Sequence, residues 1–121
     1  MSNGEEEPPK HWMVDVFDAL DSAGGGPVHL QQIYKQVIGA RRQRRDSIGD
    51  EPEATIRSTL QEYCAECTRN ARRKYTKRFD VFRMDKRQGR GWWRLHMPGA
   101  AEFKDRRRAL TSEELADLIH A

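Results

Sequence analysis

The sequence predicts an α+β fold with three amphipathic helices, then a two-stranded β-hairpin, and an extra helix near the C-terminus. Apolar residues recur every three or four positions in the first half of the chain. In the second half, two β-prone runs flank a glycine-rich turn. A length of 121 residues, of which 36% are hydrophobic and 34% charged, suits one domain with a small core and an ionic surface.

The start of the chain and its hydropathy limit the class of protein. Residues 1–9 are acidic and contain two prolines, so we expect a disordered tail there. This start lacks the basic and apolar segments of a secretory signal. No apolar run approaches the ~20 residues of a membrane helix. We therefore expect a cytoplasmic protein with no membrane partner.

The first two predicted helices are separated by a glycine-rich stop at residues 24–27. The first begins near Lys10, and its apolar stripe consists of Met13, Val16, Phe17 and Leu20. The stripe of the second consists of Leu30, Ile33, Tyr34, Val37 and Ile38. We expect a very short strand at Val28 and His29, and an end of the second helix at Gly39.

A third helix is predicted over about Glu51–Thr68, opened by a capping box of Asp50 and Glu53. Its core stripe consists of Ile56, Leu60, Tyr63, Cys64 and Cys67. The segment before it, Ala40–Asp50, is rich in arginine and has no apolar period. We therefore expect that segment to be an exposed loop.

The β-prone runs 79–84 and 92–96 flank the basic, glycine-rich stretch 86–91, which predicts a hairpin with a basic tip. A hairpin of this size is not stable alone, so the helices must cover its apolar face. Phe82, Trp93 and Leu95 are the expected contacts.

Pro98 and Gly99 are expected to break the chain. This divides it into a domain over residues 10–97 and a linker with a short helix over residues 98–121. Thr111 and Glu114 form a second capping box, and the apolar side of the helix that it opens consists of Leu115, Leu118 and Ile119. That helix packs back on the domain or meets a partner.

Three helices followed by a hairpin, with a tiny strand after the first helix, is the element order of a winged helix-turn-helix. Three stretches also resemble a known family, namely GGGPVHLQQIYKQV, PEATIRSTLQEYC and DVFRMDKRQGRGWWRL. They are similar to winged-helix modules at the ends of restriction-type nucleases and related chromatin proteins (HARE-HTH-like). The resemblance covers roughly residues 10–96 and implies a DNA-binding module. Two departures are Arg94, where the family usually has glycine, and a longer loop at 40–50.

Charge is distributed unevenly along the chain. The net charge is −4 over residues 1–39, +8 over 40–95 and −1 over 96–121. Concentrated positive charge is typical of proteins that bind a polyanion. Most of these cations are arginines, whose planar guanidinium suits phosphates and guanine edges. The alternative interpretation is a solvated basic surface that keeps the protein soluble.

The candidate DNA-binding residues form four groups. In a winged helix the third helix enters the major groove, and its residues off the apolar stripe are Thr55, Arg57, Ser58 and Gln61. The loop arginines, expected to contact phosphates, are Arg41, Arg42, Arg44 and Arg45. The stretch after the third helix adds Arg72, Arg73 and Lys74, and the wing tip adds Lys86, Arg87 and Arg90. Each group could instead be an ordinary solvated surface.

Three other motifs carry weaker signals. Cys64 and Cys67 have the spacing of half a zinc site, but no second pair is near, so we expect buried thiols and no metal. A faint nuclease pattern, Asp80, Asp85 and Lys86, lies on an exposed hairpin without a pocket, so no catalytic residue is expected. Trp92 and Trp93 face opposite sides of a strand. Trp93 belongs to the core, and Trp92 either stacks on a base or covers the C-terminal helix.

The sequence thus predicts a non-enzymatic, nucleoid-associated protein that binds double-stranded DNA without a cofactor. A regulator or a targeting module of a restriction or defence system fits this prediction. A homodimer, or a partner nuclease or methyltransferase, is compatible with it. Two alternatives stay open, a winged helix that docks on an acidic protein and RNA binding through the same surface.

Overall fold

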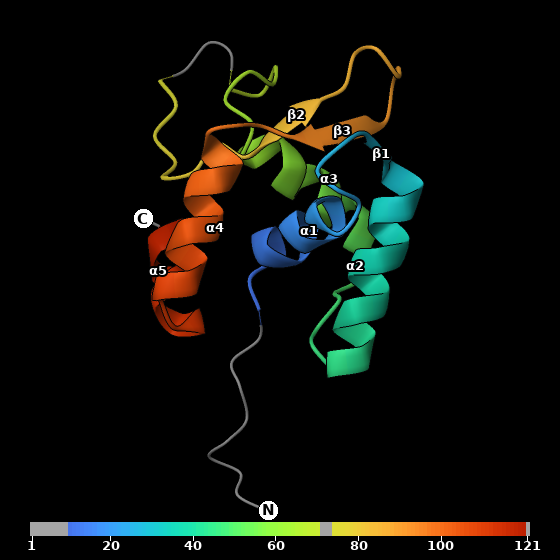
Figure 1. The fold of residues 1–121 in the computed structure, drawn as a ribbon. Helices are drawn as coiled ribbons and strands as arrows, with labels where there is room; N and C mark the ends of the chain where they lie inside the picture. The colour runs from blue at the N-terminus through green and yellow to red at the C-terminus, as the bar shows by residue number, and fades with distance from the viewer. Residues whose placement is uncertain (1–9, 71–73, 121) are drawn as a thin grey trace, which may run out of the picture.

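The structure is a computed structural model that describes residues 10–70 and 74–120. The described residues form five helices and one small antiparallel sheet of three strands, so the predicted α+β class is confirmed (Figure 1). In chain order the elements are α1 (Trp12–Asp21), β1 (Val28–His29), α2 (Leu30–Arg44), α3 (Pro52–Glu62), β2 (Phe82–Met84), β3 (Trp92–Leu95), α4 (Gly99–Ala109) and α5 (Ser112–His120). The tail expected at residues 1–9 lies outside the described residues.

The core lies between the first three helices and the inner face of the sheet. The α1 stripe predicted from the sequence is buried, as are the central residues of the α2 and α3 stripes. These buried side chains are Met13, Val16, Phe17, Leu20, Ile33, Tyr34, Val37, Ile56 and Leu60. The helical period therefore identified the buried faces correctly, because one apolar stripe per helix must pack against its neighbours.

The second helix is longer than the sequence predicts. It continues through Gly39 to Arg44 and ends at Arg45, whose φ of 62° is left-handed. The predictions of a helix end at Gly39 and of an exposed loop from Ala40 are therefore wrong. The extra turn is held by Arg41, which is buried and bonded to Asp15 on α1.

The third helix is shorter than predicted and ends at Glu62. The side-chain Nδ2 of Asn70 donates to the carbonyl oxygens of Gln61 and Cys64, at 2.9 and 2.8 Å. These bonds satisfy carbonyl groups that have no partner at the end of the helix. The predicted capping box of Asp50 and Glu53 is wrong. Glu51 is the N-cap, without a side-chain hydrogen bond, and Pro52 starts the helix.

The sheet has the strand order β1–β3–β2, with both pairs antiparallel. The predicted hairpin and the predicted short strand are confirmed, and β3 is the central strand. Phe82 pairs with Leu95, and Val28 pairs with Trp93. All four side chains are buried, so the expected covering of the hairpin by the helices is confirmed.

The expected linker after residue 98 is wrong, because residues 99–109 form α4. Its Phe103 is fully buried and packs between Phe17 and Phe79, with ring centroids 4.8 and 5.1 Å apart. The sequence did not predict α4 because Phe103 has few apolar neighbours in the chain, so residues 99–109 show almost no helical repeat of apolar residues. The capping box of α5 is confirmed, since the Thr111 N–H donates to Glu114 Oε1 and the Glu114 N–H donates to Thr111 Oγ1.

The C-terminal helix contacts the start of α1 through two histidines. The ring centroids of His11 and His120 are 4.7 Å apart. His11 also caps α1, because its Nδ1 accepts a hydrogen bond of 3.0 Å from the Met13 N–H. Burial lowers the pKa of His11, and positive charge on His120 lowers it further. The nearby cations Arg41 and Lys77 act in the same direction, whereas the carboxylate of Glu62 opposes them.

Acidification is expected to destabilise the protein through His11. The unfolded chain binds the proton near the ordinary histidine pKa of 6.5, whereas folded His11 binds it only at lower pH. The contribution of neutral His11 to the free energy of unfolding is therefore complete above pH 6.5 and is lost as the pH falls below that value. Urea midpoints at about pH 7.5 and about pH 5.5 measure the effect. His11→Asn can still cap α1 but does not titrate, so its midpoint should fall less than that of the wild type. An equal fall in both proteins would contradict the prediction.

Within residues 10–70 and 74–120, no helix combines the length and the hydrophobicity needed to cross a membrane.

Candidate nucleic-acid interface

The loop between β2 and β3, residues 85–91, has a defined shape and a basic surface; we call it the wing loop. Asp85 Oδ1 accepts hydrogen bonds from the N–H groups of Arg87 and Gln88, at 3.1 and 3.3 Å. Gly89 and Gly91 have φ angles of 103° and 87°, which other residues rarely adopt. The exposed cations of the loop are Lys86, Arg87 and Arg90. The carboxylate of Asp85 thus orders the backbone, while the cations face solvent.

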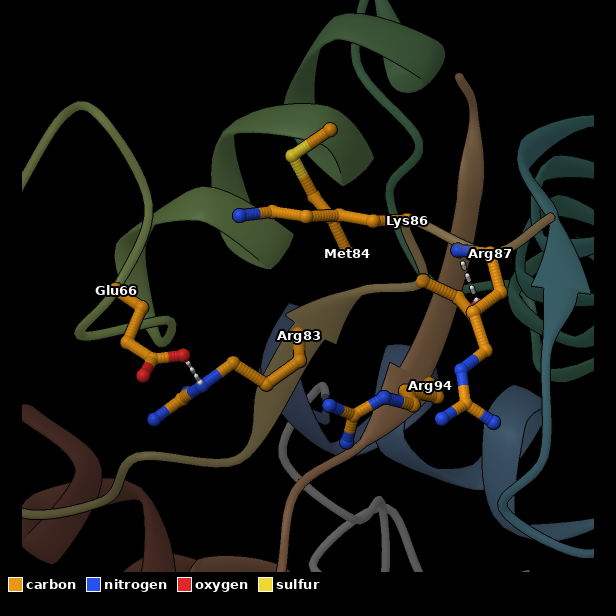
Figure 2. A pocket seen from close by; sticks show the side chains of 7 residues that line it. Glu66, Arg83, Met84, Lys86, Arg87 and Arg94 are labelled. Carbon is orange, nitrogen blue, oxygen red and sulfur yellow. Dashed lines mark hydrogen bonds and ion pairs between the residues drawn. The ribbon is translucent and has the colours of Figure 1, made fainter. Parts of the chain in front are cut away.

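A hollow of about 520 Å³ lies at the base of the wing loop; we call it the wing hollow. Figure 2 shows Arg87 and Arg94 on one side of it and Glu66, from the turn after α3, on the other, while the Lys86 side chain extends across towards the Glu66 side. Arg83 lies between them, and its Nε donates to Glu66 Oε2 at 2.8 Å. Among the described residues, no carboxylate forms an ion pair with Lys86, Arg87 or Arg94.

The charge of Arg83 is balanced within the fold. Its two terminal nitrogens bond the two oxygens of Asp80, at 2.6 and 2.8 Å. Burial would raise the pKa of Asp80, but the hydrogen bonds from Arg83 and from the Ala65 N–H lower it overall. Asp80 is therefore an ionised structural partner. Its engagement with Arg83 gives no support to the faint nuclease pattern that it forms with Asp85 and Lys86.

The predicted contact residues of α3 are not equally accessible. Arg57 is exposed and donates to the Tyr34 hydroxyl at 2.9 Å, and Gln61 is exposed. Thr55 and Ser58 are half-buried. The Thr55 hydroxyl donates to the Glu51 carbonyl, and the Ser58 hydroxyl accepts from Arg69, so both are engaged within the protein.

The N-terminal end of α3 is acidic, because Asp50 and Glu51 precede the helix and Glu53 lies in its first turn. Asp50, Glu51 and Glu53 are exposed and line a hollow of about 320 Å³ together with Arg57. Carboxylates near a helix N-terminus are favourable for the helix itself. The same carboxylates would repel phosphates, so the negative charge of this end disfavours contact with a polyanion.

Arg41, Arg42 and Arg44 lie in the last turn of α2, and Arg45 is its C-cap, so the group is not in a loop. Arg41 is 3% exposed and bonded to Asp15, which removes it from the accessible surface. Arg44 is bonded to Asp15 and Asp46, each at 2.8 Å. Arg42 and Arg45 are exposed, but Figure 1 shows the end of α2 on the opposite side of the molecule from the wing loop. The basic residues therefore do not form one continuous ridge.

Of the basic stretch after α3, Arg72 and Arg73 lie outside the described residues, and Lys74 is exposed. Two further cations were not among the predicted contacts. Arg69 lies over α3, with its Nη1 2.9 Å from Ser58 Oγ, and Arg94 lines the wing hollow. The only sequence signal for Arg94 was its departure from the glycine usual in the resembling family.

Cys64 and Cys67 form a disulfide in the turn after α3. The expectation of free thiols on a helical stripe is therefore wrong, because α3 ends before both residues and the turn brings their Cα atoms to 5.4 Å. Both residues are buried, as predicted. Among the described residues, no group of three His, Cys, Asp or Glu side chains could hold a metal ion.

The two tryptophans face opposite sides of β3, as predicted. Trp93 is buried in the core, and Trp92 is half-buried. Trp92 meets His29 edge to face, with ring centroids 5.3 Å apart. Its ring thus lies on the outer face of the sheet beside β1, and base stacking stays a prediction.

No family model, curated protein or solved structure matches this chain.

Proposed function

We propose that this protein is a non-catalytic, winged helix-turn-helix protein that binds double-stranded DNA. The observation that carries the proposal is the group of four cations at the wing, Lys86, Arg87, Arg90 and Arg94. None of them forms an ion pair with another described residue. Lys86, Arg87 and Arg90 lie on the wing loop and Arg94 lies on β3, and side chains without an ion-pair partner are available to neutralise phosphates.

The topology supports the winged-helix part of the proposal. The helices and strands follow one another as α1, β1, α2, α3, β2 and β3, and β1 pairs with the last strand of the hairpin. A helix-turn-helix with a wing has this element order. The resemblance noted for residues 10–96 implies a DNA-binding module only. A regulatory or targeting role, with a nuclease or methyltransferase as partner, is part of the proposal and stays a prediction.

Duplex binding is expected to weaken steeply with salt. If the four wing cations neutralise about four phosphates, log affinity should fall against log salt with a slope of roughly −3.6. Fluorescence anisotropy of a labelled random-sequence duplex, titrated at several salt concentrations, measures this slope. A protein that bound no duplex even at low salt would refute the proposal.

The same titration with duplex RNA and with an acidic peptide tests the two alternatives. A-form RNA has a deep, narrow major groove and a different phosphate spacing, so we expect weaker binding than to DNA. Tighter binding of RNA would assign the surface to RNA. Binding of the acidic peptide alone would assign it to a protein partner.

A further inference from the structure

We infer that the wing hollow seats the DNA backbone and that the first turn of α3 lies outside the bound duplex. This inference rests on the proposed duplex binding and deepens it, because it fixes which end of the domain meets DNA. The sequence predicted instead that α3 supplies the main reading residues.

The wing hollow has the charge that a phosphodiester requires. Lys86 and Arg87 reach it from the wing loop, and Arg94 reaches it from β3. Glu66 and Asp85 also line the hollow, and Arg83, which bonds both Glu66 and Asp80, offsets only part of this acidic charge. The four cations of the lining still outnumber its two carboxylates. The hollow therefore offers three available cations from two neighbouring segments. Charge-assisted donors that line one hollow can contact the same stretch of phosphate backbone, which cations on separate faces of the molecule cannot do.

The wing loop also has an ordered backbone, which fixes the positions from which Lys86 and Arg87 extend. Asp85 accepts from two backbone N–H groups of the loop, and β2 and β3 are paired from Phe82 to Met84. A site held by a hydrogen-bonded turn on a sheet loses less side-chain and backbone entropy on binding than a flexible tail would. The hollow thus differs from Arg42 and Arg45, which are exposed at the far end of α2.

The N-terminal end of α3 has the opposite character. Asp50, Glu51 and Glu53 place three carboxylates where a groove-entering helix would approach phosphates. The Thr55 hydroxyl is engaged by the backbone of its own helix. Farther along α3, the Ser58 hydroxyl is engaged by Arg69. Of the predicted four, Arg57 and Gln61 are exposed, but Arg57 donates to the Tyr34 hydroxyl and lines the same hollow as the three carboxylates.

Three charge variants of the full chain test this orientation. Arg87→Ala with Arg94→Ala removes two cations of the hollow. Arg106→Ala with Arg108→Ala is the matched control, because it removes the same charge from exposed positions on α4. Glu51→Gln with Glu53→Gln neutralises the first turn of α3. Affinity for a duplex, its salt slope and its sequence preference are measured for each, after circular dichroism shows that the variant is folded.

The hollow variant should lose about tenfold or more in affinity, and its salt slope should become shallower by about 2. The control should keep the wild-type slope, and the glutamine variant should keep the wild-type sequence preference. The inference is overturned if the hollow variant behaves like the control, or if the glutamine variant changes the preference. Failure of the wild type to bind any duplex would instead refute the proposed function itself.

A measurement on the unmodified protein keeps the test valid if the hollow variant does not fold. Backbone amide NMR shifts, recorded during titration with the duplex, should change most at residues 86–94. Residues 50–54 should change least. The reverse order of shifts would place α3 in the groove and overturn the inference.

Discussion

Replacing Asp15 with alanine is expected to lower the free energy of unfolding by about 3 kcal/mol or more, because it leaves a buried guanidinium without its counter-charge. Asp15 and Arg41 each have side chains only 3% exposed, and Asp15 Oδ2 lies 2.7 Å from Arg41 Nη1. The same oxygen accepts from Arg44 at 2.8 Å. Chemical denaturation of the wild type and the variant measures the loss.

The other contacts of Arg41 do not supply a negative charge. Its nitrogens donate to the carbonyl oxygens of Lys10 and Ser47, and its guanidinium carbon lies 4.1 Å from the centroid of the Trp12 ring. These contacts keep Arg41 in its place, so it stays buried when Asp15 is removed. Because the variant also removes the bonds from Asp15 to Arg41 and Arg44, the helical turn at residues 41–44 should fray, and its amide protons should exchange faster with solvent.

Two comparisons separate the buried pair from a general charge effect. Asp18→Ala breaks an ion pair with Arg107 one turn along α1, where the side chains are 41% and 30% exposed. A pair that stays this accessible to solvent contributes about 1 kcal/mol, so this variant should lose far less stability. Asp15→Leu combined with Arg41→Met should recover most of the loss, since no unpaired charge remains. Equal losses from Asp15→Ala and Asp18→Ala would contradict the buried-pair argument.

Replacing Gly99 with alanine is expected to cost about 3 kcal/mol, because the new methyl group would overlap a backbone atom. A Cβ built on Gly99 would lie 1.7 Å from the carbonyl oxygen of Asp80. A backbone oxygen cannot rotate away as a flexible side chain can. The backbone at Asp80, just before β2, would have to move, and this would disturb the hydrogen bonds of the Asp80 carboxylate with Arg83 and with the Ala65 N–H.

Gly39→Ala is the matched control for Gly99→Ala. Gly39 lies within α2, and a Cβ there would meet no atom within 4 Å. Alanine should therefore stabilise the protein by about 0.5–1 kcal/mol, through its better helix propensity. Thermal or urea unfolding measures both variants. A stable Gly99→Ala protein would show that α4 can dock without its close approach to Asp80.

The wing is the part of the candidate site that the sequence predicted best. Basic residues beside glycines, between two β-prone runs, are a local pattern, and Lys86, Arg87 and Arg90 are exposed on the wing loop as expected. The local sequence pattern could not predict which side chains of α3 are accessible to a partner. Whether Ser58 is free depends on Arg69, and the position of Arg69 depends on the turn that the disulfide closes.

The sequence by itself determined the α+β class, the apolar faces of the first three helices, the hairpin and the capping box of α5, because each depends on residues close together in the chain. Only the tertiary structure decided where α2 and α3 end and that α4 exists. Arg41 extends α2 through Asp15, 26 residues away in sequence, and α4 docks through Phe103 on Phe17 and Phe79. A local pattern contains no information about such partners. Arginines that look alike in the sequence therefore have different roles, which depend on their tertiary contacts. Arg41 at the end of α2 is a buried structural residue, whereas the arginines at the wing are available to a partner.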